Sequence, residues 1–290
     1  LLFSLIAYGY SSLVNVGDML SVQVNMADGG LDSGTARGNS FFWIYSAKNA
    51  SYEIETAVPN VVFSGRENMQ MVGSAVAGVE IQNGRTSAIT ARIPVFSAKE
   101  FDATWYMPMP GGITFRPDGE LFRFSFPEKL KVQQAYLADK NGLFVLAKGL
   151  PASGGGPDTE WVVANPGTGV AGKWKWDSAL EDISAGLPEG GKFGSRFSYD
   201  SSEKLPDEKV LRDFIVSLSC AGMAEKDHSI NKKRFDHRER SLGIENRIRH
   251  GRVLLLFLDS SSFLLPVNIK RSFPRTAQIN VLRIQLPEEK

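Results

Sequence analysis

Apolar and polar side chains alternate with a period of two residues through much of the first 150 residues. The clearest case is the segment from Met19 to Met26. Its apolar positions are Leu20, Val22, Val24 and Met26, and its polar positions are Ser21, Gln23 and Asn25. Successive side chains of a β-strand point to opposite faces, so this pattern predicts a strand with one apolar face and one face in water.

Similar short segments follow, and turn-forming residues separate them. We expect further strands at Phe41–Tyr45, Tyr52–Val58, Ala88–Phe96, Leu121–Phe126, Lys131–Leu137 and Leu143–Ala147. The turns are expected at Asp28-Gly29-Gly30, Asn83-Gly84, Pro117-Asp118-Gly119 and Asn141-Gly142, whose residues supply the φ values that tight reversals need. Many short strands with regular turns, and no helical pattern between them, predict an all-β antiparallel sandwich rather than a doubly wound parallel sheet.

The composition changes after residue 151, and we therefore divide the chain into three regions. Residues 1–151 form the predicted β-sandwich. Residues 152–200 are rich in Gly, Pro and Trp, which favours an ordered loop region because disordered segments rarely carry many large aromatic residues. Residues 201–290 are expected to form an irregular, partly helical C-terminal extension with a helix at 206–219 and a basic stretch at 226–252.

Charge and hydropathy exclude several classes of protein. The formal net charge is only +1, so no overall field attracts nucleic acid, membranes or acidic substrates. The longest apolar run, Val253 to Leu258, is far shorter than the roughly 20 residues that a membrane-spanning helix requires. The single cysteine, Cys220, excludes an internal disulfide and is expected to be a packing residue.

One glycine-rich segment offers an alternative function. Residues Gly167 to Lys173 match the phosphate-binding loop pattern G-x-x-x-x-G-K, and Asp259 follows an apolar run as a second magnesium ligand would. Trp174 stands where that pattern needs Ser or Thr to hold magnesium. A P-loop-like ATPase therefore remains an alternative, and a glycine-rich surface loop beside a core strand is the simpler interpretation.

A carbohydrate-binding β-sandwich is the second alternative. Trp161, Trp174 and Trp176 would then be stacking platforms, provided that they are exposed. For enzymes of other kinds we find no suitable constellation, because the sequence has no G-x-S-x-G motif and the three histidines lack metal-ligand spacing. We therefore predict a protein that is not an enzyme and that has no catalytic residue, cofactor or metal.

Basic residues cluster only in the C-terminal region, with acidic residues between them. The candidate RNA contacts are Lys232, Lys233, Arg234, Arg238, Arg240, Arg247 and Arg249. The interleaved acidic residues halve the local field, so a solvated, salt-bridged face is the competing interpretation.

Three segments resemble the jelly-roll capsid proteins of picorna-like RNA viruses, of the iflavirus, dicistrovirus and marnavirus type. In Leu2 to Met26, an apolar helix leads through Tyr8-Gly9-Tyr10 and Gly17 into the first long strand. Ser87 to Ser97 is similar to a strand that ends in Pro, a bulky pair and Ser, with Phe101 closing the turn. Val132 to Pro151 resembles the closing hairpin, which stops at Gly149-Leu150-Pro151.

The resemblance covers about half the chain and departs from the family at two points. Asn15-Val16-Gly17 replaces the usual Trp-Arg-Gly, and Asp139-Lys140-Asn141 replaces an Asp-Asp-Phe. The family's strands before Leu1 are missing, so we expect a jelly roll that is incomplete at the N-terminus.

The resemblance implies a structural capsid subunit of a small icosahedral virus that assembles in the host cytoplasm and resides in the virion. Its expected partners are sibling capsid subunits, genomic RNA on the inner face and a host receptor, with no membrane span.

Overall fold

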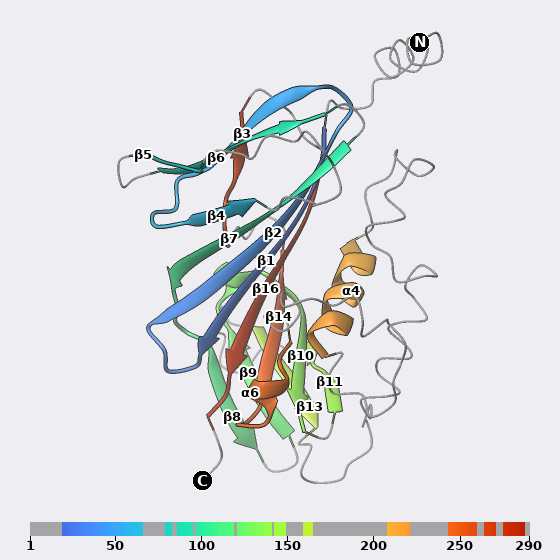
Figure 1. Cartoon of the computed structure of the whole chain (residues 1–290). Helices are drawn as coiled ribbons and strands as arrows, with labels where there is room; N and C mark the ends of the chain where they lie inside the picture. Colours follow the sequence, from blue (N-terminus) through green and yellow to red (C-terminus); the bar gives the residue numbers. More distant parts are fainter. Residues whose placement is uncertain are drawn as a thin grey trace.

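In the part of the chain that the structure describes, β-strands form three sheets and there is almost no helix (Figure 1). The computed structural model describes residues 19–65, 79–82, 86–94, 97–118, 121–140, 142–148, 159–164, 208–220, 243–259, 264–270 and 275–287. The predicted all-β class is confirmed by these residues.

The largest sheet has eight strands and runs the length of the molecule. In spatial order they are β11 (Gly142–Val145), β10 (Val132–Asp139), β14 (Val253–Leu258), β16 (Arg275–Gln285), β1 (Met19–Gly30), β2 (Thr35–Ser46), β7 (Ser97–Pro108) and β4 (Val62–Gly65). Neighbouring strands are antiparallel at every pairing except that of β1 with β16, which is parallel from Leu20 and Arg275 to Gly30 and Gln285. The expected wholly antiparallel arrangement is therefore wrong at the centre of this sheet.

Two smaller sheets cover one face of the large sheet, which we call the inner face. One contains β15 (Asn268–Ile269), β3 (Ala50–Thr56), β6 (Thr86–Ile93) and β5 (Val79–Gln82). The other contains β12 (Ala147–Lys148), β13 (Thr159–Ala164), β9 (Leu121–Phe126) and β8 (Thr114–Asp118), and the short 3-10 turn Glu128–Leu130 follows β9. Buried residues of all three sheets form one continuous hydrophobic core, to which Ile54, Phe124, Phe42 and Leu256 belong.

Two helices pack on the opposite, outer face. Helix α4 (Glu208–Cys220) confirms the predicted helix to within two residues, and α6 (Glu245–Ile248) follows later in the chain. Ile215 and Val216 of α4 and Ile244 beside α6 are buried against strands β1, β14 and β16. Cys220 is buried in the same cluster, as expected of a packing residue.

Most of the predicted strands are present. β9 has the predicted bounds, and β1, β2, β3, β6, β10 and β11 contain most of their predicted segments. One detail of β1 is wrong: its polar residues Ser21, Gln23 and Asn25 are not in water but almost completely buried. The reason is that the smaller sheets cover this face, so that β1 is enclosed on both sides.

The C-terminal region differs from the expected extension. Its strands β14 and β16 lie inside the large sheet, and β16 separates β14 from β1 (Figure 1). Strand β13 of the predicted loop region also joins a sheet. The first and last described strands, β1 and β16, thus pair at the centre of one sheet.

Candidate functional site

A cluster of charged side chains joins β1, β16 and α6 on the outer face. Asp28 accepts two hydrogen bonds from Arg283, at 2.6 Å from Nε and 2.7 Å from Nη2, while Arg247 Nη1 lies 3.2 Å from its Oδ1. The strand register produces the first contact, because Asp28 and Arg283 are direct partners across the parallel pair. We call these three residues the Asp28 cluster.

The Asp28 cluster holds more positive than negative charge. The Arg283 side chain is 1% exposed and that of Asp28 is 9% exposed, so their bidentate pair is nearly dry. The pKa of Arg247 is lowered, chiefly because the side chain is partly buried. The negative charge of Asp28 opposes this shift, and the positive charge of Arg283 adds to it. One carboxylate thus serves two guanidinium groups.

A second polar arrangement lies on the inner face, within the core. Asn25 donates to Asn280 Oδ1 at 2.8 Å, and Ser40 donates to Asn25 Oδ1 at 2.6 Å. Trp105 Nε1 in turn donates to Ser40 Oγ at 2.8 Å. We call these four residues the polar row, which crosses the neighbouring strands β16, β1, β2 and β7.

The chemistry of both arrangements is structural. The polar row contains amide, hydroxyl and indole groups, and each hydrogen bond satisfies a group that would be costly to bury alone. In the Asp28 cluster, the single carboxylate is engaged by the two guanidinium groups. Within the described residues, no group of acidic, histidine and cysteine side chains could hold a metal ion.

The predicted RNA contacts are placed only in part. Arg247 belongs to the Asp28 cluster, and Arg249 is exposed in the turn that follows α6. The remaining candidates, Lys232, Lys233, Arg234, Arg238 and Arg240, lie outside the described residues.

The ATPase elements are placed only at Asp259. Gly167 to Lys173 lies outside the described residues. Asp259 directly follows β14, where its carboxylate accepts a hydrogen bond of 3.1 Å from Gln133 and its backbone N–H donates to Lys131. The apolar run before it is a buried core strand, as the simpler interpretation predicted.

The carbohydrate alternative depends on exposed tryptophans, and Trp161 does not meet this condition. Its side chain is 4% exposed and packs beside Phe126, with ring centroids 6.0 Å apart. It is a core residue between β9 and β12. Trp174 and Trp176 lie outside the described residues.

Sequence reasoning missed Asp28, Arg283 and the polar row. We interpreted Asp28 as a turn residue and Asn25 as solvent-exposed. No local signal identifies these partners, because 255 positions separate Asp28 from Arg283. The sequence offered one clue: Arg283 is a charged residue in a segment that alternates with apolar residues, and burying an unpaired charge is costly.

Comparison with known protein families and with curated proteins finds no match to this chain. Among the described residues, no helix is long and apolar enough to cross a membrane.

Proposed function

We propose that this chain is a structural shell subunit, an incomplete jelly-roll capsid protein of a small icosahedral RNA virus. The observation that carries the proposal is the fold class: sheets packed face to face around one extended core. In such a subunit the function lies in broad surfaces and in sheet edges, and no residue is catalytic.

The edges of the large sheet support this proposal. Strands β4 and β11 end the sheet within the described residues, and each carries an exposed valine, Val62 at 64% and Val145 at 44%. An edge strand presents backbone N–H and C=O groups that can pair with another chain. Apolar side chains at both edges suit burial between neighbouring subunits.

The proposed partners are sibling subunits at the edges and genomic RNA on the inner side of the shell, with a host receptor outside. Assembly would take place in the host cytoplasm, and the mature protein would reside in the virion. The sequence resemblance is the source of these details.

Sedimentation velocity tests the proposal. The chain is expressed together with the products of its adjoining coding sequence, and the purified sample is sedimented over a range of concentrations. We expect a discrete, fast-sedimenting species with a fixed subunit ratio. A chain that remains monomeric at every concentration, with its neighbours present, would contradict the proposal.

Val62→Asp provides a more specific test at the β4 edge. A charge at this exposed position leaves the monomer fold intact but opposes burial in a contact between subunits. We expect the melting temperature of the monomer to be unchanged and the fast species to decrease. Thr114→Asp, at an exposed position on β8, is the matched control.

A further inference from the structure

On the outer face, Asp28 has an arginine on each neighbouring strand: Arg283 on β16 and Arg37 on β2. Arg37 of β2 is the register partner of Asp28, so the two side chains share one face. Arg37 is exposed and, among the described residues, has no ion pair. Asp28 is already bound to Arg283 and Arg247 on its other sides. The single negative charge of Asp28 therefore does not balance the positive charges of the three arginines around it.

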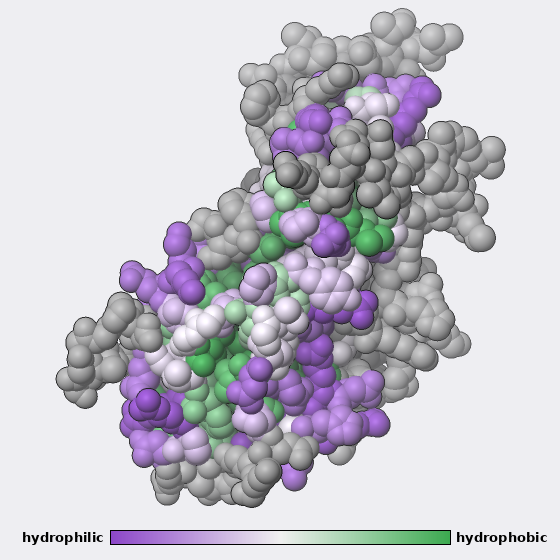
Figure 2. Space-filling model, turned by 90° about the vertical axis from the view of Figure 1, so that its left-hand side faces the viewer, coloured by the Kyte–Doolittle hydropathy of each residue, from purple (hydrophilic) through white to green (hydrophobic). Residues whose placement is uncertain are grey.

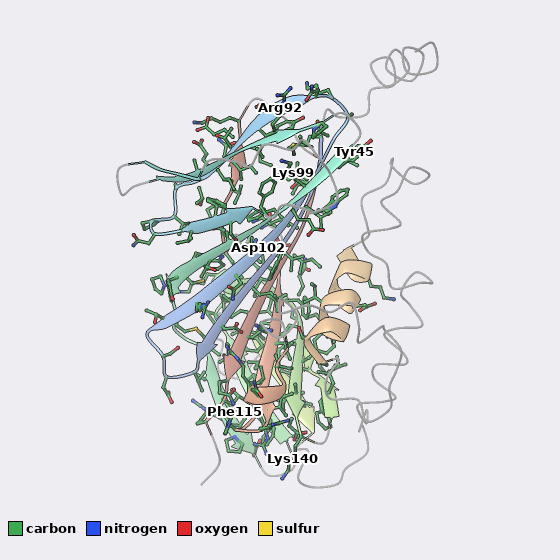
Figure 3. All side chains as sticks on the ribbon, viewed as in Figure 1. Tyr45, Arg92, Lys99, Asp102, Phe115 and Lys140 are labelled. Carbon is green, nitrogen blue, oxygen red and sulfur yellow. The ribbon has the colours of Figure 1, made fainter. Side chains whose placement is uncertain are left out.

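Nearby segments add positive charge to this end of the outer face. The segment 243–252, which contains α6, has three arginines against a single glutamate, and one of them, Arg252, lies 4.0 Å from Asp139. Arg249 and His250 of this segment are exposed, and Lys140 lies exposed at the same end of the molecule as α6 (Figure 3). The β1–β2 hairpin contributes one further acidic residue, the exposed Asp32 in its turn. The local balance is thus positive although the whole chain is nearly neutral.

An exposed aromatic ring stands beside Arg37. Tyr106 of β7 is the register partner of Arg37 and is 60% exposed. It is one of three large apolar or aromatic residues that are exposed among those described. Partners across an antiparallel pair lie about 5 Å apart at their Cβ atoms. A single ligand can therefore contact the guanidinium and the ring together.

Among the described residues of the outer face, positive charge gathers at this end. Nearer the other end of the same face, the register partners of Phe41 and Trp43 are the acidic residues Asp102 and Glu100. Asp102 lies near the middle of the large sheet, away from α6 (Figure 3). On the side of the molecule that carries the β1–β2 hairpin, hydrophilic residues flank a hydrophobic area in the lower half (Figure 2). Of the two ends of this face, as far as its residues are described, the end near α6 is therefore the more favourable one for a polyanion.

We propose that Arg37, Tyr106, Arg247, Arg249 and His250 form a binding surface for single-stranded RNA, which we call the Arg–Tyr surface. This proposal rests on the proposed shell function and adds its RNA contact. The arginines contact phosphates, and the Tyr106 ring stacks on an unpaired base. A duplex would not satisfy the second contact, because its bases are stacked on one another.

Fluorescence anisotropy with a labelled oligouridylate tests the Arg–Tyr surface in the full chain. We expect Arg37→Gln to weaken binding several-fold and to reduce the slope of log affinity against log salt by about 0.7, the value for one phosphate contact on a single strand. Tyr106→Ser should weaken binding about fivefold or more, in line with the loss of one stacked base. Tyr106→Phe should bind like the wild type, because it keeps the ring.

Arg116→Gln is the matched control, since Arg116 is an exposed arginine on β8 in a different sheet. It should leave the affinity and the salt slope unchanged, and all variants should keep the wild-type melting temperature. If Arg37→Gln and Tyr106→Ser bind RNA as the wild type does, the proposal is wrong. If heparin competes fully and Tyr106→Ser has no effect, the surface is a general polyanion site, which also overturns it.

Particle formation, measured on the same samples, separates this proposal from the shell function. If particles form and the Arg37→Gln variant binds RNA as the wild type does, only the Arg–Tyr surface is overturned. RNA binding that depends on Arg37 and Tyr106, in a chain that never forms particles, would support the surface and overturn the shell function.

Discussion

Replacing Asp28 by Asn should destabilise the protein strongly. The substitution removes the charge that Arg283 binds through two hydrogen bonds of 2.6 and 2.7 Å, while the guanidinium stays 1% exposed. Breaking a buried ion pair by removing one partner costs about 3–5 kcal/mol, because the other charge stays buried after losing its counter-ion. A domain's total stability is only about 5–15 kcal/mol, so the loss is large.

Equilibrium urea unfolding, followed by tryptophan fluorescence, measures this effect as a change in the free energy of unfolding. Asp32→Asn is the matched control: it removes the same charge from an exposed position in the same hairpin and should change stability by less than about 0.5 kcal/mol. The double substitution Asp28→Leu with Arg283→Met should recover much of the loss, because apolar replacement of a buried pair is often neutral or stabilising.

Two results would refute this reasoning about the Asp28 cluster. The first is an Asp28→Asn variant within about 1 kcal/mol of the wild type, below the cost of an unpaired buried charge. The second is a double variant no more stable than the single one. Either would mean that the loss of its pair with Asp28 does not determine the cost of burying Arg283.

Three further predictions concern the core and α4. Gly38→Ala should cost about 1–3 kcal/mol in a thermal or urea melt, because a Cβ at this position would overlap the Trp105 indole. Asn25→Ala should cost about 1–3 kcal/mol, because the Ser40 hydroxyl loses its acceptor and Asn280 loses a donor. Burial raises the pKa of Asp213 above 3.8, so the folded state binds its proton more tightly than the unfolded state. Stability should therefore fall as pH rises above about 4, and Asp213→Asn should remove this decrease.

Each of these predictions has its own control. Gly34→Ala places a Cβ in open space and should be nearly neutral, so an equal loss at both glycines would contradict the steric explanation. Asn39→Ala, at a half-buried position on the other face of β2, should cost less than Asn25→Ala. For Asp213, the stability difference between variant and wild type is measured at pH 4 and pH 7; a difference that does not grow with pH would be inconsistent with a raised pKa.

Local patterns predicted the individual strands well. Alternation located β1, β6 and β9, and the helix-start residues before 208 predicted α4. Such patterns report which face of an element is apolar, and each depends only on residues close in sequence. For this reason the all-β class could be predicted without knowledge of the strand order.

The arrangement of the strands could not be predicted in the same way. β14 is buried on both faces and therefore shows a continuous apolar run without alternation. The parallel pairing of β1 with β16 joins residues about as distant in sequence as the described chain allows, and no turn fixes its register. The hydrogen bond between the buried Asn25 and Asn280 depends on that pairing, since Asn280 belongs to β16.

The candidate site was predicted only at Arg247 and Arg249. The sequence places these in a basic stretch but gives no indication that Arg37 and Tyr106 lie on the same face of the sheet. That proximity results from the register of β1, β2 and β7. A surface built from several strands is therefore visible only once the strands are paired.

Cryo-electron microscopy of particles purified with their RNA tests the central claim most directly. We predict closed shells in which this chain is a repeating subunit, with the end that carries α6 and the β1–β2 hairpin facing the RNA. Preparations that contain no particles would contradict the proposed function, and particles in which this end of the chain faces outward would contradict the RNA surface.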